Sequence, residues 1–229
     1  TMNVESELSN VASLIGEPAR VLMLWSLLDG EARRAGELAF FANVSPQSAS
    51  LHLAKLVEAE MLKVAAQGRN RFYSIARPEV AHIVESMAAL IPSARKNKVS
   101  PLRAIPEFRV ARTCYDHLAG RVAVEIAEAM QTKNWLRLSA SEFAVTGDGA
   151  AFFAEFGIQI EELKRQRRAF AGKCLDWSER KYHLAGALGT SLFQELLKRR
   201  WLARSKTGRT VRITLAGAKN FDSLFGIRI

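Results

Sequence analysis

The sequence predicts a mainly α-helical protein with small β-hairpins, organised as two domains. Apolar residues recur at helical spacing through most of residues 4–60. The spacing then changes to that of strands on both sides of a Gly-Arg-Asn tip at residues 68–70. Further along, the segment HLAG at residues 117–120 recurs at 183–186, which indicates an internal repeat. We therefore expect an N-terminal domain over 1–91, a linker over 92–106 and a duplicated domain over 107–229.

The N-terminal domain begins with two helices, which the Gly16-Glu17-Pro18 break separates. A short third helix leads to a turn at Asn43-Val44. Ser45 is a good N-cap and Pro46 suits the first helical position, so a fourth helix begins there. The order helix, helix, short helix, turn, helix, hairpin, helix is that of a winged helix-turn-helix. The expected elements are helices over 4–15, 19–28, 34–42 and 46–60, a hairpin over 62–76 and a helix over 79–90.

The C-terminal domain is predicted to consist of two similar copies, over about 114–158 and 180–227. Trp135-Leu136 recurs as Trp201-Leu202 at the same spacing as the HLAG segments, and residues 145–150 parallel residues 213–218. Each copy is expected to contain a helix that opens at the HLAG segment and ends near the Trp, then a hairpin and a last helix. Such a copy resembles half of a winged helix, and we expect an α+β domain whose copies bury their apolar faces together.

Charge favours a polyanionic partner, because the 229 residues carry a formal net charge of +10. Residues 1–95 hold 9 Lys and Arg against 10 Asp and Glu, so the excess lies in the second half. Two cysteines cannot make a dense disulfide framework. No apolar run reaches the length of a membrane helix, and the first ten residues lack the features of a signal peptide. We therefore expect a cytoplasmic protein with no membrane partner.

The fourth helix is expected to contact DNA. Ala49, Leu53 and Leu56 fall on one side of it, so the opposite side faces outward. Gln and Ser side chains there can reach base edges in the major groove, Leu51 can contact a thymine methyl, and Lys55 can reach phosphate. Arginines at the hairpin tip can contact the backbone or the minor groove. The candidate DNA-binding residues are Ser45, Gln47, Ser48, Ser50, Leu51, His52, Lys55, Arg69 and Arg71, and the partner is a double-stranded operator.

At these residues the sequence resembles the ArsR/SmtB family of metal-responsive and small-molecule-responsive repressors. The resemblance is carried by LIGEPAR at 14–20, ELA at 37–39, SPQSASLHLAKL at 45–56 and GRNRFY at 68–73. It implies a homodimer, joined through the terminal helices of the first domain, that represses an operator and releases it when an effector binds. The family's third-helix cysteines are missing, since LAFFA stands at 38–42. In the fifth helix, His82 with Glu79 and Glu85 offers at most half of a zinc site.

The second domain is the expected place for effector sensing. Two thiolates and two imidazoles suit zinc or another thiophilic ion, and a redox signal through the thiols is an alternative. The two histidines are repeat-equivalent whereas the two cysteines are not, which favours a shared structural role for the histidines instead. The candidate effector or metal residues are Cys114, Asp116, His117, Cys174, Asp176, Trp177 and His183.

Three further interpretations remain open, beside a remote fourth. An organic effector could bind among aromatic residues, namely Tyr115, Trp135, Trp177, Tyr182 and Trp201. The basic second half could add DNA contacts through Lys164, Arg165, Arg167, Arg168, Lys198, Arg199 and Arg200. The whole chain could also be an architectural nucleic-acid-binding protein without an effector. A thiol-dependent enzyme using Cys114 or Cys174 is a remote alternative, because the sequence has no phosphate loop, no paired catalytic carboxylates and no G-x-S-x-G motif. Because these catalytic motifs are missing from the sequence, we predict that the protein is not an enzyme.

Overall fold

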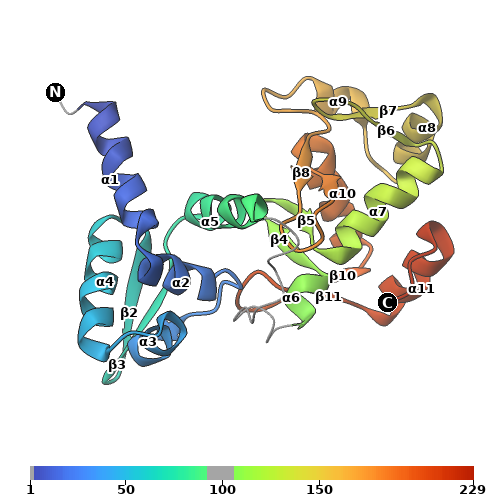
Figure 1. Cartoon of the computed structure of the whole chain (residues 1–229). Helices are drawn as coiled ribbons and strands as arrows, with labels where there is room; N and C mark the ends of the chain where they lie inside the picture. Colours follow the sequence, from blue (N-terminus) through green and yellow to red (C-terminus); the bar gives the residue numbers. More distant parts are fainter. Residues whose placement is uncertain (1–2, 92–105) are drawn as a thin grey trace. The chain divides into compact units, whose positions relative to one another are not determined.

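The computed structural model describes residues 3–91 and 106–229, which belong to two compact units (Figure 1). We call residues 3–91 unit 1 and residues 106–229 unit 2. The linker predicted over 92–106 lies outside the described residues except for Pro106, which begins a helix. Among the described helices, none combines the length and the apolar character needed to cross a bilayer.

Unit 1 is a winged helix-turn-helix. The predicted helices and hairpin are confirmed, with small shifts at their ends. A two-residue strand that was not predicted pairs with the second strand of the hairpin, Arg33 opposite Tyr73 and Arg34 opposite Phe72, so the sheet has the order β1-β3-β2. The elements are α1 (Val4–Gly16), α2 (Pro18–Ser26), β1 (Arg33–Arg34), α3 (Ala35–Ala42), α4 (Pro46–Glu58), β2 (Leu62–Gln67), β3 (Asn70–Ile75) and α5 (Pro78–Leu90).

Local chemistry sets the turn between α3 and α4. Asn43 ends α3 in the left-handed conformation, with φ of 52°, and its backbone N–H bonds to the carbonyl of Phe40. Two residues later, the Ser45 hydroxyl accepts a hydrogen bond from the Ser48 backbone N–H at 3.2 Å. Pro46 follows at the first helical position. These residues end one helix and begin the next within a short turn, which aims α4 away from α3.

Unit 2 contains two copies of one order of elements: short helix, hairpin, helix, hairpin, helix (Figure 1). Every hairpin is a separate two-stranded antiparallel sheet. The first copy comprises α6 (Pro106–Val110), β4 (Arg112–Cys114), β5 (His117–Ala119), α7 (Arg121–Thr132), β6 (Leu136–Leu138), β7 (Phe143–Val145) and α8 (Gly147–Glu155). The second comprises α9 (Ile160–Lys164), β8 (Lys173–Leu175), β9 (Tyr182–Leu184), α10 (Gly186–Lys198), β10 (Leu202–Arg204), β11 (Val211–Ile213) and α11 (Leu215–Phe225).

The helices predicted to open at the HLAG segments and to end near the tryptophans are present as α7 and α10, but they begin later than expected. The first residues of the two segments form the strands β5 and β9, while α7 begins at Arg121 and α10 at Gly186. Gly120 has φ of 90°, a conformation that L side chains rarely adopt, and a Cβ there would lie 2.7 Å from the carbonyl oxygen of Arg109. Gly186 likewise has φ of 73°. Each glycine therefore lies where the chain changes from strand to helix, and each copy begins earlier than predicted, at residues 106 and 160.

The two copies pack against each other reciprocally. Helix α7 of the first copy packs on β9 of the second, and α10 packs on β5. Isolated bridges also cross between the copies, at Arg112 with Thr210 and at Glu142 with Gly172. Each copy thus places its long helix on a hairpin of the other copy, as expected for two copies related by a pseudo-twofold axis. This packing builds one common core whose largest fully buried side chains are Phe143, Phe153, Phe193 and Phe221.

Candidate DNA-binding face and Cys2His2 cluster

Helix α4 has a buried apolar side and an exposed polar side, as the spacing of its apolar residues predicts. Ala49, Leu53 and Leu56 are fully buried against the rest of unit 1. Gln47 and Lys55 are exposed on the other side, and Leu51 keeps 68% of its surface accessible. A polar, protruding helix face that follows a short helix and a turn has the geometry of a recognition helix, whose first turns enter the major groove.

Three of the candidate DNA-binding residues already have local partners. Ser45 caps α4, and the Ser50 hydroxyl donates to the carbonyl of Pro46 at 2.9 Å. His52 is half-buried, and its Nδ1 lies 3.5 Å from Nη1 of Arg20. Arg20 itself is buried and donates to the carbonyl of Leu14 at 2.6 Å. These contacts hold the start of α4 and its flank in place, which leaves Gln47, Ser48, Leu51 and Lys55 as the outward-facing set.

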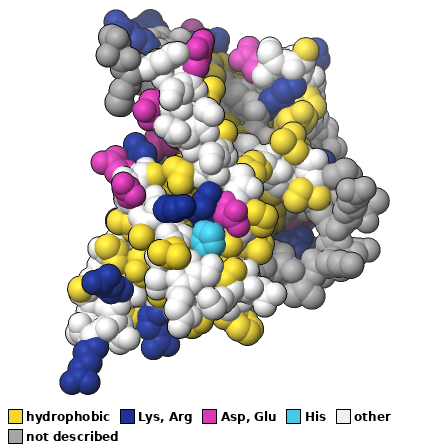
Figure 2. Space-filling model, turned by 60° about the vertical axis from the view of Figure 1, so that its left-hand side comes forward, with side chains coloured by type: hydrophobic (Ala, Val, Ile, Leu, Met, Phe, Trp, Pro, Cys, Tyr) yellow, Lys and Arg dark blue, Asp and Glu magenta, His cyan; other side chains and the backbone are white. Residues whose placement is uncertain are grey.

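The wing is the β2–β3 hairpin, whose loop consists of Gly68 and Arg69. Gly68 has φ of 60°, so the glycine permits this two-residue turn. Arg69 and Arg71 are both exposed. Figure 2 turns unit 1 toward the reader and shows basic side chains projecting at its lower end, where the hairpin ends in Figure 1. The wing thus carries positive charge to the edge of the unit.

A groove joins the wing to α3 and α4, and sequence reasoning missed two of its residues. Ser50, Arg69 and Arg71 line it together with Arg34 and Phe40. Phe40 is 83% exposed, and Arg34 lies at the start of α3. The Arg33-Arg34 pair before a helix was the available signal. It was not used because β1 is too short to show a strand period.

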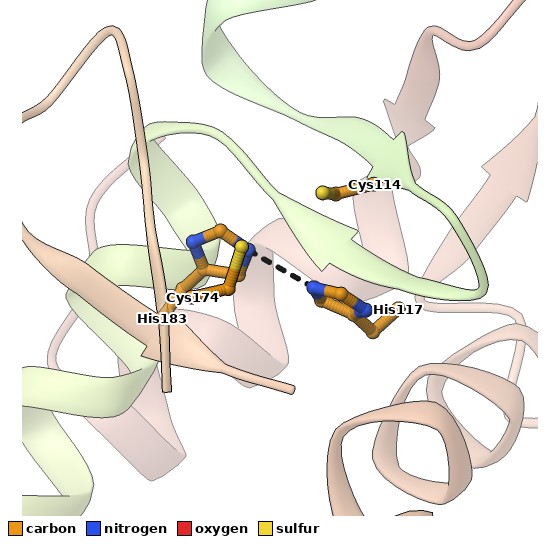
Figure 3. A group of neighbouring side chains, drawn as sticks. All are labelled: Cys114, His117, Cys174 and His183. Carbon is orange, nitrogen blue, oxygen red and sulfur yellow. Dashed lines mark hydrogen bonds between the residues drawn. The ribbon is translucent and has the colours of Figure 1, made fainter. Parts of the chain in front are cut away.

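In unit 2, four of the candidate effector residues form a compact cluster (Figure 3). Cys114 lies opposite His117 across the β4–β5 hairpin, and Cys174 lies opposite His183 across β8–β9. One ligand atom from each residue falls within 4.8 Å of the others, and Nε2 of His117 is 3.2 Å from Nε2 of His183. The cysteines are therefore structurally equivalent, which corrects the prediction that only the histidines correspond. The loop of the β8–β9 hairpin is longer than that of β4–β5, so the spacing between cysteine and histidine differs in the two copies and their correspondence is not visible in the sequence.

A carboxylate lies behind each imidazole of the cluster. Asp116 Oδ1 is 3.4 Å from Nδ1 of His117, and Asp176 Oδ2 is 3.9 Å from Nδ1 of His183. Burial opposes the ionisation of Asp116, but hydrogen bonds from Arg168 and its neighbours outweigh it and lower the pKa of Asp116 to about 2. Asp116 is therefore an anion near neutral pH.

Asp176 is the more deeply buried of the two carboxylates. It pairs with Arg112 at 2.8 Å and accepts the backbone N–H of Gly120 at 2.8 Å. Burial raises the pKa of Asp176. The charges of Arg112 and His183 and the hydrogen bond from Ser178 outweigh this effect, so the pKa of Asp176 lies well below its usual range. Asp176 is therefore not one of the four clustered residues, but it lies beside the His183 ring and helps to hold it in place.

The three tryptophans among the aromatic candidates lie in structural positions, whereas Tyr115 and Tyr182 are exposed. Trp177 packs against the guanidinium of Arg112, whose Cζ is 4.9 Å from the indole ring. Trp135 stacks on Phe152 with ring centroids 3.9 Å apart, and Trp201 contacts Phe156 edge-on. These contacts assign the two repeat-related tryptophans to the common core of unit 2.

The helix-turn-helix, its wing and the outward face of α4 define a DNA-binding protein of the winged-helix class. Over 222 residues the chain is 40% identical to YdfF of Bacillus subtilis (strain 168), an uncharacterized HTH-type transcriptional regulator, and the match covers 97% of this chain and 98% of the relative. The chain therefore belongs to the HTH-type transcriptional regulators. No protein-family model matches it.

Solved structures similar to this chain cover a smaller part of it. HlyU from Vibrio cholerae is 24% identical and covers 39% of this chain and 97% of its own, with a TM-score of 0.36. The antimony-specific transcriptional repressor AntR is 25% identical and covers 42% of this chain and 87% of its own, with a TM-score of 0.38.

Proposed function

We propose that this chain is a homodimeric repressor of the ArsR/SmtB kind, which binds a double-stranded operator and releases it when an effector binds in unit 2. The observation that carries the proposal is the outward face of α4 beside an exposed basic wing. Gln47 and Ser48 supply base contacts, while Lys55, Arg69 and Arg71 supply phosphate or minor-groove contacts.

The homodimer rests on the terminal helices of unit 1. In α1, Val4 and Leu8 are 80% and 67% exposed, and in α5 Leu90 is 82% exposed beside Ile83 and Met87. Apolar side chains at helical spacing on two helices favour burial against a second copy. Two copies related by a twofold axis then present two recognition helices to successive major grooves, about one DNA turn apart.

Effector sensing is assigned to unit 2 because both cysteines of the chain lie there and are clustered. Helix α3 has no cysteine, and on α5 Glu85 is buried while His82 is exposed. These positions do not favour a family-type metal site in unit 1.

The test is selection of bound sequences from random duplex DNA by the full chain, followed by titration of the selected and random duplexes at one salt concentration. A repressor of this kind binds its selected site at least about a thousandfold more tightly than random DNA. Similar affinity for both, with a steep salt dependence, would indicate the architectural nucleic-acid-binding alternative instead.

A further inference from the structure

We infer that Cys114, His117, Cys174 and His183 form a tetrahedral binding site for a thiophilic divalent cation such as Zn²⁺, which joins the two copies of unit 2. The binding of the ion stands by itself. Its use as the effector that controls DNA binding rests on the proposed function.

The distances within the cluster fit such an ion. Tetrahedral zinc holds imidazole nitrogens at about 2.0–2.1 Å, which places two of them roughly 3.3 Å apart. The two Nε2 atoms are already 3.2 Å apart. Two thiolates on the same ion would lie about 3.8 Å apart, because zinc–sulfur bonds are about 2.3 Å long. All four ligand atoms fall within 4.8 Å, so they need to move by no more than about 1 Å to close on one ion.

The orientation of the imidazoles also favours metal binding. Figure 3 shows the Nε2 atoms of His117 and His183 pointing toward each other. Without an ion, two nitrogens at this separation can share only one proton. The opposite Nδ1 atoms face Asp116 and Asp176, the carboxylate position that orients metal-bound histidines and strengthens them as ligands. Nδ1 of His183 is buried and makes no hydrogen bond in the described structure, and its proton would face Asp176 once Nε2 binds the ion.

The charge of the site suits its burial. Cys114, His117 and His183 are buried and Cys174 is half-buried. Two thiolates neutralise a divalent cation, so the filled site adds no net charge to the interior, and the nearby Asp176 is already neutralised by Arg112. Cys174 is the most exposed of the four ligands, so an ion would reach the site from its side.

The fold supplies a mechanical role for the ion. Each hairpin contributes one cysteine and one histidine, and the hairpins come from different copies. A bound ion therefore joins β4–β5 to β8–β9, next to the places where α7 and α10 cross between the copies. Because a ligand that binds only the folded state stabilises it, the metal should raise the melting temperature of unit 2.

The binding test uses the full chain, purified without chelators, stripped and kept reduced without oxygen, and titrated with Co²⁺. We expect one Co²⁺ per chain, the strong visible bands of tetrahedral cobalt, a thiolate charge-transfer band, and loss of all three on adding Zn²⁺. Cys174→Ser and His183→Ala should lose the tetrahedral spectrum, whereas the control His82→Ala, which removes a histidine of unit 1, should keep it. Cobalt bands that survive in both cluster variants, or that never form, would overturn the site.

A second measurement needs no variant and guards against misfolding of the substituted proteins. Stoichiometric Zn²⁺ should protect both cysteines of the unmodified chain from alkylation, and a chelator should restore their reactivity. Equal alkylation with and without Zn²⁺ would contradict metal ligation. If the purified chain instead contains a Cys114–Cys174 disulfide and its reduced form binds no metal, the cluster is a redox pair and the inference fails.

The regulatory role is tested separately, by titrating the selected operator with and without Zn²⁺. We expect the metal to weaken operator binding by about tenfold or more in the unmodified chain and to have no effect in Cys174→Ser. Tetrahedral Co²⁺ binding with unchanged operator affinity would uphold the metal site and overturn its role as sensor. Metal binding by a chain that selects no DNA sequence would overturn the repressor function and leave the metal site intact.

Discussion

The last helix of each copy in unit 2 starts with the same contacts. The Thr146 hydroxyl accepts the Gly149 backbone N–H at 3.0 Å, and Thr214 accepts from Gly217 at 2.9 Å. At both glycines a Cβ would collide with a tryptophan carbonyl, that of Trp135 or its equivalent in the second copy. The paired Thr, Gly and Trp residues of the repeat thus have a steric explanation: the helix start packs directly on the backbone.

Gly149→Ala should therefore destabilise the protein by about 1–3 kcal/mol, the usual cost of forcing extra volume into a packed site. Gly147→Ala in the same helix is the control, because a Cβ at Gly147 meets nothing within 4 Å. Urea unfolding of the two variants checks this. Equal midpoints would show that the backbone moves aside at little cost.

The Arg112–Asp176 ion pair is buried, with side chains 1% and 0% exposed. Asp176→Asn keeps the shape and removes the carboxylate charge that lies 2.8 Å from Arg112. We expect a loss of about 3–5 kcal/mol of stability, because removing one partner of a buried ion pair is costly. Glu161→Gln, which breaks the exposed pair with Lys164, should cost about 1 kcal/mol or less. Similar unfolding midpoints for both variants would contradict this difference.

At the scale of elements, α4 and the wing should make distinct contributions to binding. Gln47→Ala should cost roughly 1–3 kcal/mol at the selected operator and less on random DNA, because base contacts specify the sequence. Arg69→Ala should weaken binding to both and reduce the salt slope by about one. Fluorescence anisotropy over a range of salt concentrations measures both effects.

Matched controls lie in unit 2. Gln159→Ala removes an exposed glutamine and Arg228→Ala an exposed arginine, and neither should change binding to either DNA. If Gln47→Ala and Arg69→Ala lose the same affinity on operator and random DNA, α4 is not the recognition helix.

At the scale of the whole molecule, the assembly depends on α1 and α5. Leu8→Glu and Ile83→Glu place charges on the exposed apolar faces of these helices and should produce monomers with weakened operator binding. Light scattering after gel filtration gives the mass. The control is Leu215→Glu, which adds the same charge at a leucine of α11 that is 94% exposed. Dimers that persist in both test variants would exclude this interface.

The fold of unit 1 and the candidate residues could be predicted from the sequence alone. Helical spacing, the Ser45-Pro46 start of α4 and the glycine at the hairpin tip are signals confined to a few neighbouring residues, so they can be read without knowing the fold. The repeat in unit 2 was also visible, because the two copies must satisfy the same contacts, such as the glycine that packs on a tryptophan carbonyl.

Which residues of unit 2 lie close together could not be predicted from the sequence. The strands of unit 2 have three residues each, too few to show alternation, so the β4–β5 and β8–β9 hairpins were missed and the HLAG segments were read as helix. The two Cys-His pairs correspond through strand register, while the longer loop between Cys174 and His183 disrupts their correspondence in the sequence. Periodicity is a property of one element, whereas the meeting of two elements depends on register, loop length and packing. For that reason the sequence could name the four candidate ligands, and only the fold could bring them within reach of one ion.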